Sequence, residues 1–368
     1  YSITQMPIYL GLVGLVQFLP MVLFTLVVGY IADRYDRKKI ICFSQIAESI
    51  GLFFLALESQ NRSITVEGIL LTIFFISTAN AFQGPSMQSL LPNVVSKEVF
   101  PEVAALAAST AQFAFIIGPA IGGILYALNP EVVYSIACVL TLATSVIILF
   151  ISIRKESPNS EPMTRNSLFG GIAFIRSKPA IFGAISLDLF AVLFGGATAL
   201  LPVYASNILN IGPLGLGLLR SAPAVGALIT SAFLARKPLK RNEGLKMFIA
   251  VIFFGIFTIV FAVSTSFLVS LASLVLLGAS DVVSVVVRLT LIQLQTPDNM
   301  RGRVNAVNSM FIGTSNQLGE FESGLTASLF GVVPAVLIGG IGSIIVAILW
   351  MKLFPELLKA NNLGNSTN

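Results

Sequence analysis

The chain has 368 residues, of which 55% are hydrophobic and only 11% are charged. A soluble domain carries about 25% charged residues, because its surface has to face water. Together with a mean hydropathy of +0.90, this composition excludes a soluble globular protein and indicates a polytopic membrane protein. The chain has no histidine, and Cys42 and Cys138 lie far apart. We therefore predict no metal site, no cofactor and no redox chemistry.

Eleven apolar runs are each long enough to cross a hydrocarbon core of about 30 Å as a helix. Their length and uniform hydrophobicity argue against the strands of a membrane barrel, so an all-α fold is predicted. The predicted spans are 8–32, 39–57, 68–91, 103–127, 132–153, 179–204, 214–235, 245–263, 267–295, 303–329 and 332–354.

Almost all of the 22 lysines and arginines fall in every second loop. By the positive-inside rule these loops are cytoplasmic. We expect a multi-pass protein of the plasma membrane, in particular of a bacterial inner membrane. The net charge of +5 is then an orientation signal, so no nucleic-acid partner is expected.

An internal repeat relates the two parts of the chain. Gln17 and Pro20 align with Arg220 and Pro223. The stretch that begins at Gln83 aligns with the stretch that begins at Arg288, at nearly the same separation in residue number. The expected organisation is an N-terminal half at 1–153, a cytoplasmic linker at 154–178, a six-helix C-terminal half at 179–358 and a disordered tail at 359–368. The span at 179–204 has no counterpart, and we expect one helix to be missing at the N-terminus, giving 11 of 12 helices. Repeated halves are typical of transporters, with the solute site between them.

The loop after the first span has the most specific motif. It reads Gly-x-x-x-Asp-Arg-x-x-Arg-Lys, with Gly29, Asp33, Arg34, Arg37 and Lys38 at the signature positions. Gly29 allows close helix approach, and Asp33 can accept hydrogen bonds from an arginine or a helix N-terminus. A plain positive-inside loop would explain the basic residues, although it would not require Gly29 or Asp33.

This motif resembles the loop signature of the major facilitator superfamily, and the resemblance extends over most of the chain. It implies two six-helix lobes that alternate access, with this loop as a conformational latch. The second half lacks the corresponding glycine and aspartate, so the latch role is carried over only for the first half. Other strings resemble the branch that contains enterobactin and macrolide exporters.

A second string has Gly118, Pro119, Gly122 and Gly123. It resembles the signature of antiporters within that superfamily, although Ala114 stands where the family usually has glycine. Close helix packing through Gly118 and Gly122 would explain the same pattern. The resemblance favours export.

Charged residues within predicted spans are candidates for function, because each costs about 2.5–3.5 kcal/mol to insert at the bilayer centre. We expect Arg220 to pair with Glu320 or Glu322, and Arg288 with Asp188 or Asp281. An unpaired carboxylate in a low dielectric tends to hold a proton, so Asp188 is the first choice for proton coupling and Asp281 the second. Purely structural ion pairs are the alternative, and Glu48 has no obvious partner.

The linker contains Leu168, Phe169, Ile172 and Ile175 on roughly one helical face. This pattern predicts a short helix over 165–178 that lies at the cytoplasmic interface. A disordered tether is the alternative.

The sequence therefore predicts a secondary active exporter rather than an enzyme. Protons would be exchanged for a bulky, partly apolar organic solute of the drug or siderophore class, by a monomer embedded in the lipid bilayer. The chain has no Gly-rich phosphate loop followed by Lys and Ser or Thr, so ATP is not the direct energy source. An importer or facilitator of the same superfamily is one alternative, and an intramembrane lipid-modifying enzyme is another.

Overall fold

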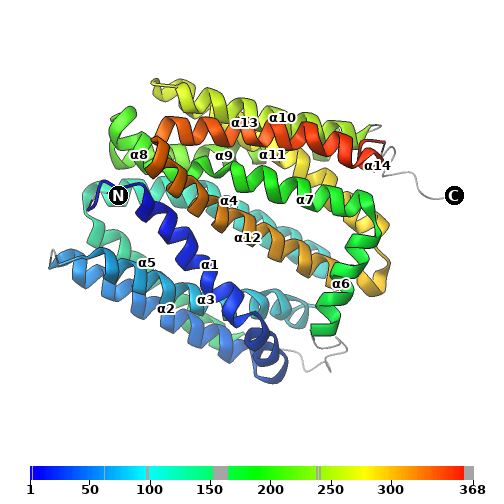
Figure 1. The fold of residues 1–368 in the computed structure, drawn as a ribbon. Coiled ribbons are helices and arrows are strands. Elements are labelled where there is room, and N and C mark those ends of the chain that lie inside the picture. Colours follow the sequence, from blue (N-terminus) through cyan, green and yellow to red (C-terminus); the bar gives the residue numbers. More distant parts are fainter. Residues whose placement is uncertain are drawn as a thin grey trace. The chain divides into compact units, whose positions relative to one another are not determined.

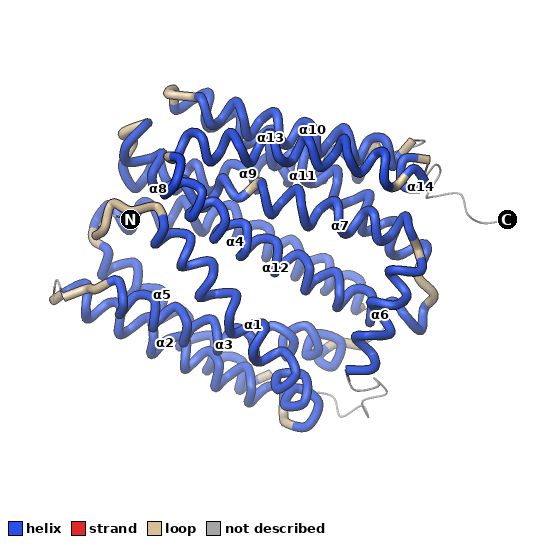
Figure 2. The backbone as a smooth tube through the Cα atoms, viewed as in Figure 1, coloured by secondary structure: helices blue, strands red, loops and turns tan. Residues whose placement is uncertain are grey.

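A computed structural model describes residues 1, 3–61, 63–96, 99–151, 165–237, 239 and 242–359. Every regular element in these ranges is a helix (Figure 2). The long helices of the first part are α1 (Ile8–Arg34), α2 (Arg37–Gln60), α3 (Val66–Val94), α4 (Phe100–Leu128) and α5 (Pro130–Phe150). After α6 (Arg165–Ser177) come α7 (Pro179–Phe194), α8 (Leu201–Val203), α9 (Gly212–Arg236), α10 (Glu243–Val263), α11 (Phe267–Gln295), α12 (Asp298–Phe330), α13 (Val332–Leu353) and α14 (Pro355–Leu358) (Figure 1).

The described helices coincide with the predicted spans, which confirms the all-helical fold. Nine of them, within the described ranges, are long and apolar enough to cross a membrane, with Pro179–Ile208 counted as one. The apolar part of α1 is shorter, Ile8–Phe24. α12 has 33 residues but carries charges in its first two turns and again at Glu320 and Glu322, which lowers its hydropathy.

The span predicted at 179–204 falls within one segment of membrane-crossing length, Pro179–Ile208, but the helix is irregular in its second part. α7 ends at Phe194, a 3₁₀ turn covers Gly196–Leu200, and a π turn covers Tyr204–Ile208 after α8. Pro202 contributes because it has no backbone N–H to donate to the preceding turn. A Cβ at Gly196 would collide with the backbone of Gly319 on α12, so the break coincides with a close helix contact.

The described chain forms two compact units. One consists of Tyr1, Gln5–Gly14 and Asn166–Asn368, and the other of Ser2–Thr4 and Leu15–Arg165. In the second unit α2 packs against both α3 and α5. Lys38 at the start of α2 donates a hydrogen bond from Nζ to the carbonyl oxygen of Ile151, just after α5, at 2.8 Å.

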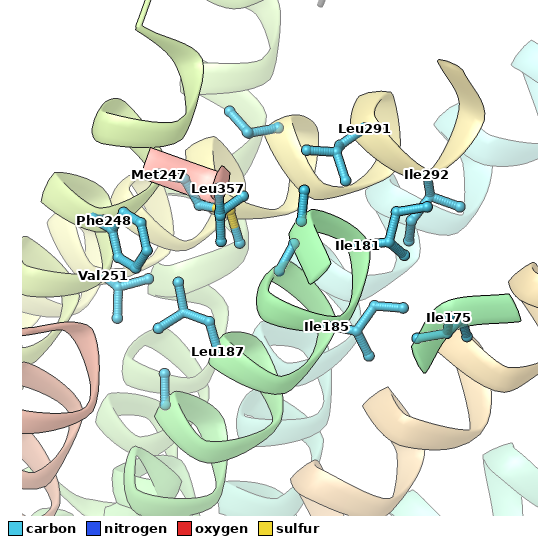
Figure 3. Close-up of a cluster of buried hydrophobic side chains, with 14 of the residues drawn as sticks. Ile175, Ile181, Ile185, Leu187, Met247, Phe248, Val251, Leu291, Ile292 and Leu357 are labelled. Carbon is cyan, nitrogen blue, oxygen red and sulfur yellow. The ribbon is translucent and has the colours of Figure 1, made fainter. Parts of the chain in front are cut away.

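The unit that contains Asn166–Asn368 has the larger buried core. Apolar side chains from α6, α7, α10, α11 and α14 meet there, including Ile185, Phe248, Leu291 and Leu357 (Figure 3). The chain's single tryptophan, Trp350 on α13, packs against this core and donates from Nε1 to Ser186 Oγ at 2.9 Å. Its fluorescence is therefore a natural reporter of the integrity of this unit.

Small residues set the distance between α9 and α11 in the same unit. A Cβ at Gly226 would overlap the backbone of Val275, and a Cβ at Gly278 would overlap that of Pro223. Because lipid offers no hydrophobic drive between helices, close backbone packing of this kind is a main source of helix association in membranes.

We expect Gly226→Ala to destabilise the protein by about 1–3 kcal/mol, because backbone atoms cannot move aside as a side-chain end can. Gly302→Ala is the matched control, since no heavy atom of the described residues lies within 4 Å of its Cβ position. That control should be neutral or gain up to about 1 kcal/mol from helix propensity. Thermal unfolding in detergent, followed by Trp350 fluorescence, measures both, and equal midpoints for the two variants would contradict the packing argument.

Candidate functional site

The strongest candidate site is an ion pair between α7 and α11. Arg288 Nη1 pairs with Asp188 Oδ2, as expected from the sequence, and both residues are almost completely buried, with exposed fractions of 2% and 6%. Arg288 Nε has no hydrogen-bond partner among the described residues. Two opposite charges that are buried away from water compensate each other. Removing one of them leaves the other buried without a counter-charge.

A small cavity with room for about one water molecule lies next to this pair. Its polar lining comes from Asp188, Asp281 and Ser284, and Ala191, Val192, Val251 and Phe254 form the apolar wall. Ser284 is 3% exposed, and its hydroxyl has no partner among the described residues. Asp281 forms no ion pair within the described chain. The site therefore combines two carboxyls, one guanidinium and a free hydroxyl around a space that can hold water.

Helix geometry explains why these groups meet. Asp281, Ser284 and Arg288 follow one another at intervals of three and four residues, which places them on one face of α11. Sequence analysis found both charges but missed Ser284, although the same spacing could have revealed it.

A second polar group lies further along α12. Arg220, whose side chain is exposed, lies within electrostatic reach of Glu320. The described residues show no ion pair between the two, so the expected pairing stays a prediction. Glu322 instead accepts a hydrogen bond from the hydroxyl of Thr326 at 2.8 Å, one turn along the same helix. The two glutamates thus have different neighbours, in agreement with their spacing of two residues.

The first part of α1 packs against this stretch of α12. A Cβ at Gly11 would lie 3.0 Å from Gly324 Cα, and a Cβ at Gly14 would lie 2.7 Å from Glu320 Cβ. Such close approach is possible only for glycine, so the beginning of α1 is fitted to the Glu320 region.

The motif loop joins α1 to α2 through Tyr35 and Asp36. Asp36 caps α2 by accepting a hydrogen bond from Lys38 N at 3.0 Å. The backbone of Gly29, Asp33 and Arg34 belongs to α1, but the side chains of Asp33 and Arg34 and the surroundings of Gly29 lie outside what the structure describes. Arg37 is described and has an interaction partner, and the latch role of this loop stays a prediction.

The antiporter-type string lies in α4, where Pro119 is inside the helix. Among the described residues, no heavy atom lies within 4 Å of a Cβ position at Gly118 or Gly122. Within their own unit, no described residue therefore packs closely on these two glycines, and Gly123 is buried. The role of the string stays a prediction. On α2, Glu48 does have a partner, because its carboxylate hydrogen-bonds to the Asn80 side chain of α3.

The fold and the buried charges define a multi-pass membrane protein of the transporter class. The family model of the Major Facilitator Superfamily matches residues 4–320. The chain therefore belongs to the major facilitator superfamily and mediates transmembrane transport of a small molecule; this is a family of transporters, not of enzymes.

Two curated relatives are bacterial exporters. The chain is 25% identical to the enterobactin exporter EntS of Citrobacter koseri over 362 residues, covering 97% of this chain and 85% of the relative. It is 24% identical to EntS of Escherichia coli over 334 residues, covering 89% and 79%.

Solved structures share the fold at low sequence identity. A mutant of the nucleoside transporter NupG superposes with a TM-score of 0.73 at 17% identity, covering 96% of this chain and 92% of the other. A bacterial homolog of the human lysosomal transporter Spinster, inward-facing and occupied, gives a TM-score of 0.69 at 13% identity, covering 95% and 88%. At these identities the likeness concerns the fold alone.

We expect Asp188→Asn and Arg288→Gln each to destabilise the protein by about 3–5 kcal/mol, because each leaves a buried charge without its partner. The double variant should cost clearly less than the sum of the two single changes. Thermal unfolding followed by Trp350 fluorescence gives the three values.

Arg220→Gln is the control for loss of an arginine, because an exposed guanidinium in a pair contributes only about 0–1 kcal/mol. Strict additivity of the Asp188 and Arg288 changes would mean that the two side chains are not coupled.

Proposed function

We propose that this transporter is a proton-coupled exporter of a bulky, partly apolar organic solute, working by alternating access as a monomer. Two observations favour export over import or facilitated diffusion. The relatives that cover most of this chain are named as enterobactin exporters, and the string at Gly118–Gly123 resembles the antiporter signature. A drug-like or siderophore-like solute agrees with both.

The cavity beside Asp188, Asp281 and Ser284 carries the proposal of proton coupling. Two carboxyls line it, and only one guanidinium, that of Arg288, pairs with them, so one negative charge is uncompensated when both carboxyls are ionised. In a low dielectric that charge is costly, and uptake of one proton removes it. The site is thus suited to alternate between a protonated and an unprotonated form.

Within this site Asp281 is the better proton carrier, and Asp188 takes the supporting role. Sequence reasoning ranked them in the opposite order, because it could not tell which carboxyl Arg288 neutralises. Asp188 is the one paired with Arg288, so its charged form is the stabilised one. Asp281 has no such partner within the described chain, and the unpartnered hydroxyl of Ser284 lines the same cavity. A proton on Asp281 can reach the Asp188 side through Ser284 or a water molecule in this space.

The remaining motifs take supporting roles in the proposal. Gly29, Asp33, Arg34, Arg37 and Lys38 form a latch that is made in one access state and broken in the other. Arg220, Glu320 and Glu322 form a second charged group on α9 and α12, where the start of α1 packs. A change of access would have to alter these contacts.

We expect Asp281→Asn to abolish proton-driven transport while leaving exchange of solute across the membrane. The amide cannot take up and release a proton, but it keeps the size of the side chain and the solute path. The measurement uses proteoliposomes with an imposed pH gradient, a fluorescent lipophilic dye or enterobactin as solute, and a parallel assay of solute exchange without a gradient.

Asp281→Glu is the matched control, because it keeps the carboxyl and should restore part of the gradient-driven transport. Unchanged gradient-driven transport by Asp281→Asn would remove this residue from coupling. Transport by the unaltered protein that ignores the gradient would make the protein a facilitator, and movement only toward the cytoplasmic side would make it an importer.

A further inference from the structure

A second cavity, distinct from the Asp188 site, lies where α6 packs against α7 and α12. Its volume is about 500 Å³, within the range of about 300–1,000 Å³ that is typical of small-molecule sites. Most of the lining is apolar and comes from all three helices: Ile172, Ile175, Phe182, Ile185, Val307 and Phe311. An apolar lining of this kind favours a hydrocarbon group as the occupant.

Ile175 and Ile185 form the inner wall of this cavity. They are 4% and 3% exposed and belong to the core of this unit, and Figure 3 shows both in this apolar cluster, Ile175 on α6 and Ile185 on α7. Phe182, by contrast, is 37% exposed. The cavity is thus bounded by buried core residues on its inner side and is accessible from the other side, as a groove for an acyl chain has to be.

The polar residues of the described lining include a positive charge but no negative charge. Arg176, with an exposed side chain, is the charged residue of the described lining, and no carboxylate lines the cavity. The other polar residue, Ser186, is already occupied, because it accepts from Trp350 Nε1 and donates to the carbonyl oxygen of Phe182 at 2.6 Å. Arg176 is therefore the group of the described lining that can bind the negative charge of an occupant.

The position of the cavity in the fold selects a lipid. α6 belongs to the basic segment that the positive-inside rule places on the cytoplasmic side, and Lys178 follows directly at the start of α7. α6 also lies close on α12, since a Cβ at Gly171 would be 3.0 Å from the Arg303 carbonyl oxygen. Basic residues next to membrane helices on this side attract anionic lipid headgroups.

We propose that the cavity between α6, α7 and α12 binds one anionic phospholipid of the cytoplasmic leaflet. Its phosphate lies on Arg176, and one acyl chain lies along Ile172, Ile185 and Phe311. The bound lipid contacts α6, α7 and α12 together and thereby stabilises the packing of the linker helix α6 against α7 and α12. The site is independent of the transported solute and of the coupling ion.

Lipid retention by the purified protein tests the charge part of the proposal. In detergent with added phosphatidylglycerol, native mass spectrometry should find one retained lipid, and Arg176→Gln should weaken its binding at least about tenfold, the effect of losing one charge-assisted hydrogen bond. Arg236→Gln, at an exposed arginine in the last turn of α9, should bind as the unaltered protein does.

Labelling of the unaltered protein tests the apolar part and does not depend on the folding of a variant. Phosphatidylglycerol with a photoreactive group at the end of one acyl chain should label peptides that contain 172–186 and 307–311. Labelling spread over lipid-facing positions such as Ile338 and Ile345 of α13, both exposed, would overturn the proposal.

Three further results would each overturn it: equal retention of phosphatidylcholine, equal binding of inorganic phosphate alone, or displacement of the photolabel by a transported lipophilic dye. The last result would make the cavity a solute site. Equal loss of lipid in Arg176→Gln and Arg236→Gln would reduce the effect to general surface charge.

Discussion

The cost of placing charge inside a membrane governs this structure. Asp188 and Arg288 are both almost completely buried, and each is tolerated because the other compensates it. That pair joins α7 to α11 and fixes the position of the small cavity beside it. The remaining charged groups of the same unit follow the same rule, since Arg220 lies within electrostatic reach of Glu320, and Glu322 is satisfied by Thr326.

Asp281 is the exception within the described chain, because it shares the cavity with Asp188 but has no cation of its own. The proposed change of protonation is assigned to this acid because it has no described partner and lies beside a water-sized space. The same unit contains the second cavity, whose described lining includes Arg176 but no acid. Both proposals thus start from a charge that no described neighbour compensates, and they differ in what compensates it, a proton in one and a phosphate in the other.

The helix breaks and close contacts place these groups. The chain leaves the regular helix after Phe194 and approaches α12 through Gly196 and Gly319, while α9 and α11 approach through Gly226 and Gly278. These contacts hold α7, α11 and α12 at the distances that form the two cavities. Because membrane helices gain little from burying apolar surface against each other, such backbone contacts determine the packing more than side-chain hydrophobicity does.

The sequence by itself determined the class of protein, the helical spans and the charged residues, because hydrophobic runs and charge spacing are local properties of the chain. It also indicated the family through the loop from Gly29 to Lys38, and it anticipated Arg288 with Asp188 as one of two pairings. Only the tertiary structure decided that Asp188, and not Asp281, is the partner of Arg288. It also brought Ser284 into the site and Asn80 next to Glu48. It made the helix irregular within the span at 179–204 and formed the cavity lined by Arg176. Each of these depends on which helices lie next to one another, and that is set by contacts between residues far apart in the sequence.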